Sequence, residues 1–257
     1  MTASTAVEIL AVPGIPLVRR DDDLVALIGD GVARGGIVPR DSDVFVLAQK
    51  IVSKAEGRTF DLADVEPSAQ AIELAGKIDK DPRLVELILS ESARVVRARP
   101  GLLIVEHKLG FVMANAGVDQ SNVASPDGPQ QALLLPADPD GSAAALRKGL
   151  SQKFGVSVAV IINDSFGRAW RRGTCGVAIG AAGLPALMDL RGSPDLFGRT
   201  LQVSITGFAD EIAAAASLVM GQGAEGQPVV IVRGLTWRGA DNAASELLRP
   251  AAEDMFR

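Results

Sequence analysis

Hydrophobic positions along the chain alternate between short β-branched runs and longer stretches with helical spacing. Apolar residues run together at 7–12, 44–52, 156–162, 201–206 and 229–232, which predicts strands. Helices are predicted at 22–33, 67–78, 82–92, 140–154 and 210–220, where apolar residues share one face or where Pro or Asp opens the segment. The segments 94–97, 102–106 and 111–114 predict a small meander, 125–130 a loop with two prolines, and 176–188 stays ambiguous.

Strands and helices are interleaved, with no internal repeat and no linker long enough to divide the chain. We therefore predict an α+β fold in which mixed sheets and helices form one domain over residues 1–257, as an intertwined two-lobed unit. The string Gly221–Gly226 matches G-x-G-x-x-G, but a predicted helix precedes it and a predicted strand follows, the reverse of a Rossmann fingerprint. The chain also lacks a P-loop string, so neither nucleotide-binding fold is expected.

Composition limits the function further. The formal net charge of -5 gives no electrostatic case for nucleic-acid binding. With one His and one Cys, the chain has neither a multi-His metal site nor an internal disulfide, which suits a reducing cytoplasm. Residues 1–5 lack the pattern of a signal peptide, and the apolar run at 212–220 is too short for a bilayer. We expect a cytoplasmic protein without membrane or nucleic-acid partners.

Two polar stretches carry the candidate chemistry. Each follows an apolar run, and the first, 115–122, contains Asp119, whereas the second, 163–173, contains Asp164 and Ser165. Carboxylates and a hydroxyl at strand ends suit a hard divalent cation such as Mg²⁺ or Mn²⁺. The alternative is that both aspartates bond nearby backbone amides in loops.

Other candidates are positively charged or flexible. Lys54, at a predicted strand end, is the best lysine for a phosphate, or else a solvated surface residue. Arg168, Arg171 and Arg172 follow Asp164 closely and are suited to bidentate capture of carboxylate or phosphate, or else to surface salt bridges. The Gly221–Gly226 turn lets backbone amides approach a phosphate or base; otherwise it is a helix-ending turn with a left-handed Gly221. Cys175 is expected to be a small buried residue, and His107 a strand or turn residue.

Nine segments in order resemble the coenzyme F420:L-glutamate ligase family over nearly the whole chain. They are 14–18, 53–58, 115–119 with Asn122, 133–136, 138–142, 164–165 with 167–168, 209–213, 220–223 and 232–234. Ser165 stands where relatives often have Thr, and Gln49 where a small hydroxyl residue is expected.

The resemblance implies a GTP-dependent ligase that joins L-glutamate to coenzyme F420-0 by a γ-linkage, through an acyl phosphate, releasing GDP and phosphate. It also implies divalent metal, Mg²⁺ or Mn²⁺, together with K⁺, and an intertwined homodimer. Two other readings remain open: a nucleotide- or deazaflavin-binding module without ligase activity, and a metal-dependent phosphoryl-transfer enzyme.

The resemblance also assigns residues by position. Asp119 and Asp164 match the ligands of one metal, and Ser165 and Gln222 those of a second. Asp119, Asp164 and Lys54 form the expected catalytic set. Apart from the resemblance, the positive charge of Arg168, Arg171 and Arg172 close to Asp164 predicts that they bind the acidic substrates in the same pocket. The implied nucleotide contacts are Ile15, Pro16, Leu17, Val18, Gln49, Lys50, Lys54, Asn122, Met220, Gly221, Gln222, Gly223, Ala224, Glu225, Gly226 and Gln227.

Overall fold

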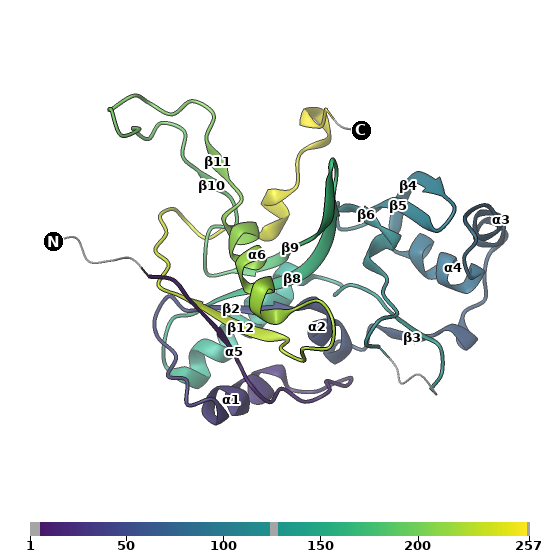
Figure 1. The fold of residues 1–257 in the computed structure, drawn as a ribbon, viewed down its shortest axis with the longest axis horizontal. Helices are drawn as coiled ribbons and strands as arrows, with labels where there is room; N and C mark the ends of the chain where they lie inside the picture. The colour runs from purple at the N-terminus through teal and green to yellow at the C-terminus, as the bar shows by residue number, and fades with distance from the viewer. Residues whose placement is uncertain (1–5, 124–127, 256–257) are drawn as a thin grey trace.

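The computed structural model describes residues 6–123 and 128–255, so residues 1–5 and part of the predicted loop at 125–130 lie outside it (Figure 1). A five-stranded sheet runs in the order β1 (Glu8–Ala11), β12 (Val229–Arg233), β2 (Val44–Ala48), β8 (Ala159–Arg168) and β9 (Arg171–Ala182). β2 and β8 are parallel, and the other neighbours are antiparallel. The mixed sheet with its helices confirms the α+β prediction.

Both faces of this sheet are covered, which explains the continuous apolar runs of its inner strands. Phe45 and Leu47 pack with α1 (Leu24–Arg34) and α5 (Pro139–Phe154) on one face. Val44 and Val46 pack with α6 (Phe208–Met220) on the other. The buried sheet therefore holds the carboxyl end of β2 and the neighbouring middle of β8 in fixed positions.

A small lobe, built from β3 to β7, has a separate hydrophobic cluster and lies beside the sheet (Figure 1). It contains α3 (Ala69–Ile78), α4 (Pro82–Ser90) and the antiparallel strands β4 (Ser92–Arg99), β5 (Leu102–His107) and β6 (Val112–Ala114). These three strands confirm the predicted meander. The chain enters through α2 (Gln49–Ala55) and β3 (Thr59–Asp61) and returns through β7 (Gln131–Leu133), which pairs with β3. The short 3-10 helices η1 (Leu62–Asp64) and η2 (Asn115–Gly117) complete the lobe.

Two predicted boundaries are wrong. The strand expected at 44–52 ends at Ala48, and helix α2 begins at Gln49. Ile51 and Val52 are buried in that helix, so the apolar run continues across the change of structure and conceals it. The helix expected from Asp140 begins at Pro139 and is capped by Asp138, which accepts from the Gly141 amide. Asp140 instead accepts hydrogen bonds from the amides of Ala181 and Ala244.

The polar stretch 163–173 is not a loop. β8 continues through Asp164 to Arg168 and turns into β9, so these residues form a long β-hairpin. The ambiguous segment 176–188 is largely β9. Of the strand expected at 201–206, only β11 (Ile205–Thr206) forms, paired with β10 (Met188–Asp189).

The arm between β10 and β11 projects away from the sheet (Figure 1). Two further 3-10 helices, η3 (Ala244–Leu247) and η4 (Ala251–Glu253), follow β12. None of the helices in the described part of the chain combines the length and apolar character needed to cross a bilayer.

Candidate functional site

A cavity of about 530 Å³ opens at the carboxyl end of β2, beside the middle of β8, where Ala48 pairs with Asn163. That volume is within the range of small-molecule sites. Its walls come from both lobes: residues 15–18, 48–51 with Lys54, Asp119 with 121–122, 163–165 and 220–228. Every residue predicted to contact a nucleotide or a metal therefore lines one cavity.

A second hollow, of about 540 Å³, lies between α5 and the start of β8 and includes Asp41, Arg147 and Lys148. It is shallower, and its lining contains neither paired carboxylates nor a glycine-rich turn. The cavity between the lobes is the candidate site.

The large lobe, which is the five-stranded sheet with its covering helices, contributes Asp164 through an irregular strand. The pairing of β8 with β9 shifts register between Ile162 and Asn163, as at a β-bulge. A bulge interrupts the regular alternation of side chains and redirects them. Asn163, Asp164 and Ser165, three consecutive residues, all line the cavity.

The small lobe contributes Asp119 through a strained turn. Asn115, Ala116 and Gly117 all have left-handed backbone, with φ of 53°, 53° and 66°. Such conformations are unfavourable for Ala and persist where surrounding structure enforces them, often at functional sites. Asp119 then pairs with Leu133 through backbone hydrogen bonds of 3.0 and 2.8 Å, which fixes it to the returning strand.

The Asp119 carboxylate is already engaged by a cation. Lys50 Nζ lies 2.7 Å from Asp119 Oδ2, and it also donates to Ser121 Oγ at 2.7 Å and to the Ser121 carbonyl at 3.0 Å. The Ser121 amide donates to Asp119 at 2.7 Å. Burial acts to raise the pKa of Asp119, but the hydrogen bonds from Lys50 and Ser121 outweigh it, and the pKa is lowered.

Asp164 is in a different electrostatic environment. Burial raises its pKa to about 6; the Ser165 amide opposes that shift, and the charge of Asp119 adds to it. The two carboxylates therefore repel each other across the cavity. A divalent cation would relieve this repulsion, because it favours the charged form of both groups.

Lys54 faces the same cavity from α2, four residues after Lys50. Its Nζ donates to the Asn122 carbonyl at 2.7 Å. Burial and the charge of Lys50 lower its pKa. Two ammonium groups from one helix converge at one end of the cavity, an arrangement that suits a phosphate chain.

The glycine-rich turn forms a further wall of the cavity. α6 precedes it and β12 follows, which confirms that it is not a Rossmann turn. Gly221 has φ of 74° and ψ of 179°, so the predicted left-handed cap is wrong: this region is reserved for glycine. Glu225 Oε2 accepts from the Gly223 amide at 2.8 Å, and Asn122 Nδ2 donates to the Gly223 carbonyl at 3.2 Å. Asn122 thus links the small lobe to the turn.

The donor set fits a hard divalent metal. Asp119 and Asp164 supply carboxylates, Ser165 a hydroxyl and Gln222 an amide, and the buried Asn163 Oδ1 has no hydrogen-bond partner among the described residues. In the part of the chain that the structure describes, no three His, Cys, Asp or Glu side chains cluster as for a metal. Oxygen ligands of mixed kind, completed by substrate phosphates, are usual for Mg²⁺.

The structure does not bring the arginine cluster into this cavity. Arg168, Arg171 and Arg172 are exposed at the tip of the β8–β9 hairpin and are not among the lining residues. Because β8 continues beyond Asp164, the strand carries them away from it. Arg168 Nη2 lies 3.5 Å from the Arg172 carbonyl.

Sequence reasoning missed several lining residues, among them Ser121 and Asn163. Ser121 stands two positions after Asp119, the spacing of an Asx-turn, and this signal points to it. Gln49 lines the cavity but is buried, and its Oε1 accepts from Ser53 Oγ at 2.8 Å. His107 ends β5, as expected for a strand or turn residue, whereas Cys175, expected to be buried, lies in β9 and is only partly buried.

Known proteins share this pattern. The profile described as F420-0:Gamma-glutamyl ligase matches residues 14–234, which include every segment of the cavity. The chain belongs to this family. A relative named coenzyme F420:L-glutamate ligase from Methanothermobacter thermautotrophicus is 46% identical over 98% of this chain and 99% of its own length. Relatives of the same name from Methanopyrus kandleri (44% identical, 96% of this chain and 98% of the relative) and Archaeoglobus fulgidus (43%, 98% and 96%) also match it.

Proposed function

We propose that this protein is a GTP-dependent ligase that adds L-glutamate to coenzyme F420-0 through a γ-linkage. The observation that carries the proposal is the convergence of two carboxylates, two lysines and a glycine-rich turn on one cavity between the lobes. Family membership supports the ligase class, and relatives named for this activity match nearly end to end.

The reaction proceeds in two steps. A carboxylate oxygen of F420-0 attacks the γ-phosphorus of GTP, the bond to the β-phosphate oxygen breaks, and GDP leaves. The glutamate amine then attacks the acyl carbon, phosphate leaves with the electrons of its C–O bond, and the amine loses a proton. Each step develops negative charge on phosphate oxygens, which preorganised cations stabilise.

The residues of the cavity divide this work. Lys50 and Lys54 bind and orient the phosphates, and the amides of the Gly221–Gly226 turn approach the nucleotide closely. The apolar segment Ile15–Val18 and the buried Gln49 form the remaining nucleotide wall. Asn122 joins the turn to the small lobe, so nucleotide binding depends on both lobes.

Asp119 and Asp164 would hold one divalent cation, and Ser165 and Gln222 a second. When bound, Mg²⁺ or Mn²⁺ neutralises the triphosphate and the charge that develops on it. K⁺ is proposed as a further cation of the site. Arg168, Arg171 and Arg172 are assigned to the acidic substrates, F420-0 and glutamate, at the hairpin rather than inside the cavity.

We also propose that the chain forms a homodimer. Large apolar side chains are exposed on both projecting elements: Leu196 and Phe197 on the arm, and Trp170 at the hairpin tip. A partner subunit would bury them, as exposed apolar patches often mark protein interfaces. Sedimentation analysis of the parent and of a Leu196→Ser, Phe197→Ser variant tests this assembly.

GDP release tests the function. The proposal expects sustained GDP release over many turnovers only when F420-0 and glutamate are both present, because the first step alone yields at most one GDP per site, and Asp119→Asn reduces this release to background. Sustained release with F420-0 alone would indicate a phosphoryl-transfer enzyme. Binding of GTP and F420-0 without release under any condition would indicate a binding module, and either result contradicts ligation.

A further inference from the structure

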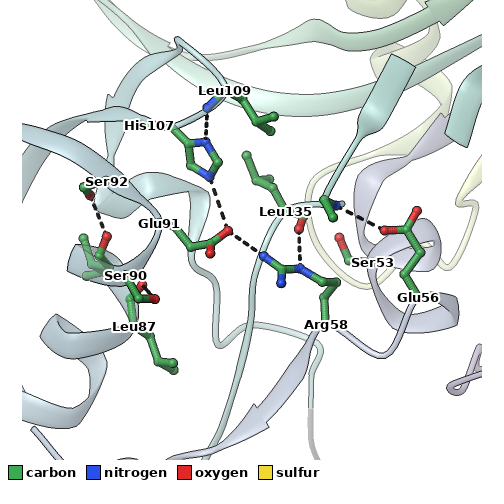
Figure 2. A network of polar contacts seen from close by, with 12 residues as sticks. Ser53, Glu56, Arg58, Leu87, Ser90, Glu91, Ser92, His107, Leu109 and Leu135 are labelled. Atoms are coloured by element: carbon green, nitrogen blue, oxygen red, sulfur yellow. Dashed lines mark hydrogen bonds and ion pairs between the residues drawn. The ribbon is translucent and has the colours of Figure 1, made fainter. Parts of the chain in front are cut away.

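One polar network joins the two lobes outside the cavity. Arg58, just after α2, places its guanidinium between the small lobe and the strand that returns from it, as Figure 2 shows. Arg58 Nη2 donates to Glu91 Oε2 at 2.5 Å, and Arg58 Nε donates to the Leu135 carbonyl at 3.0 Å. One rigid guanidinium thus makes two bonds in different directions.

The small-lobe side of this network is buried and constrained. Glu91 ends α4, and His107 ends β5 with a side chain only 2% exposed. His107 Nδ1 accepts from the Leu109 amide at 2.9 Å, so the proton of the neutral ring is on Nε2, which faces Glu91 Oε2 at 3.7 Å. At 3.7 Å this contact is longer than a hydrogen bond, and the buried Nε2 has no hydrogen-bond partner among the described residues.

The large-lobe side is equally fixed. The Arg58 amide donates to the Ser53 carbonyl at 2.9 Å, so the residue is held to α2. The Leu134 amide donates to the Arg58 carbonyl at 3.1 Å. Arg58 therefore binds residues 134 and 135 through both its backbone and its side chain, and Asp119 pairs with Leu133, the last residue of β7, directly before them.

Several other polar links between the lobes run through the cavity itself. They include Lys50 with Asp119 and Ser121, Lys54 with Asn122, and Asn122 with Gly223. Of these residues, all but Ser121 are proposed to contact nucleotide or metal, so a ligand would replace these links. The Arg58 network lies outside the cavity lining, and it persists when the others exchange.

We propose that Arg58, Glu91 and His107 are positioning residues that set where Asp119 stands relative to Asp164. The network keeps the small lobe docked while the cavity links open for ligand. The effect of the network on metal affinity rests on the proposed function, in which the two aspartates hold a cation. The effect of the network on the position of Asp119 is independent of that function.

The test compares Arg58→Lys and Glu91→Gln with a matched pair within the small lobe. Arg94 Nε donates to Glu106 Oε2 at 2.6 Å between β4 and β5, two strands of the small lobe. Arg94→Lys and Glu106→Gln are therefore the controls. Two quantities are measured on the full chain: amide hydrogen exchange at 117–122 and 131–135, and Mn²⁺ affinity by electron paramagnetic resonance.

We expect faster exchange in both segments for Arg58→Lys and Glu91→Gln, with the exchange of β2 and β12 unchanged. Mn²⁺ affinity should fall by roughly 10- to 100-fold, the usual effect of removing an outer partner of metal ligands. Neither control variant should change either quantity.

Unchanged exchange in both segments would overturn the proposal. Faster exchange with parental Mn²⁺ affinity would also overturn it, because the network would then be structural alone. If the parent itself binds no Mn²⁺, the metal assignment in the proposed function fails, and the exchange result alone decides whether the network positions Asp119.

Discussion

Lys50 forms an ion pair with Asp119, which is a proposed metal ligand. Its ammonium group is bound by three oxygens, from Asp119 and Ser121, at 2.7 to 3.0 Å. An ammonium and a divalent cation compete for the same carboxylate. In the proposed function, Lys50 neutralises Asp119 before metal and nucleotide bind, and the phosphates would then become its partners.

Replacing Lys50 by Met should affect the two ligands in opposite directions. GTP affinity falls because a phosphate contact is lost, whereas Mn²⁺ affinity in the absence of nucleotide rises about tenfold, which corresponds to about 1.4 kcal/mol. Calorimetric titration measures both. Lys54→Met is the matched control, since Lys54 contacts the Asn122 carbonyl and no carboxylate: it should weaken GTP binding alone. Mn²⁺ binding no tighter in Lys50→Met than in the parent would contradict this role.

Asp164 makes the metal-free protein less stable at neutral pH. Its folded pKa of about 6 lies above its ordinary value of 3.8. Its contribution to stability is therefore fully present below pH 3.8 and is lost as the pH rises through about 6. Asp164→Asn should abolish turnover yet raise the free energy of unfolding at pH 8 by up to roughly 3 kcal/mol. Urea unfolding at pH 5 and pH 8 in the presence of chelator measures this, and an Asn variant less stable than the parent at pH 8 would refute it.

At the scale of elements, Gly221 and Gly223 provide a sharp comparison. A Cβ on Gly221 would lie 2.2 Å from the Glu225 carboxyl carbon, and the φ of 74° already excludes most residues. A Cβ on Gly223 meets nothing closer than 3.5 Å. Gly221→Ala should therefore distort the turn, at about 1–3 kcal/mol for the strained backbone, and raise the KM for GTP well above that for glutamate. Gly223→Ala should leave both KM values close to parental. Equal effects of the two variants would show that the turn does not shape the nucleotide wall.

The elements also show where sequence reasoning works. α1 and α6 were predicted within a few residues because apolar spacing marks both locally, together with an Asp cap at α1 and an acidic first turn at α6. The α2 boundary was missed because Ile51 and Val52 are buried in either conformation. The hairpin was missed because its polar residues resemble a loop, although pairing with β9 makes them a strand. Such pairing is a long-range contact that no local pattern encodes.

At the scale of the whole molecule, the site exists only between lobes. Asp119 and Asp164 were predicted individually, and the family resemblance supplied the nucleotide contacts. Their mutual arrangement depends on how the small lobe docks, which rests on contacts such as Arg58 with Glu91, 33 positions apart. The arginine cluster illustrates the limit: nearness in sequence to Asp164 suggested a shared pocket, but the extended strand separates them.

Mass spectrometry of the product is the direct test of whether this protein ligates L-glutamate to F420-0. The protein is incubated with F420-0, GTP, Mg²⁺ and L-glutamate, and the deazaflavin product is weighed and digested to locate the new linkage. We predict that the product gains the mass of one or more γ-linked glutamyl residues, with one GDP released for each residue added. The Asp119→Asn and Asp164→Asn variants should form no such product. Recovery of F420-0 without added glutamate, from a parent enzyme that binds GTP, would contradict it.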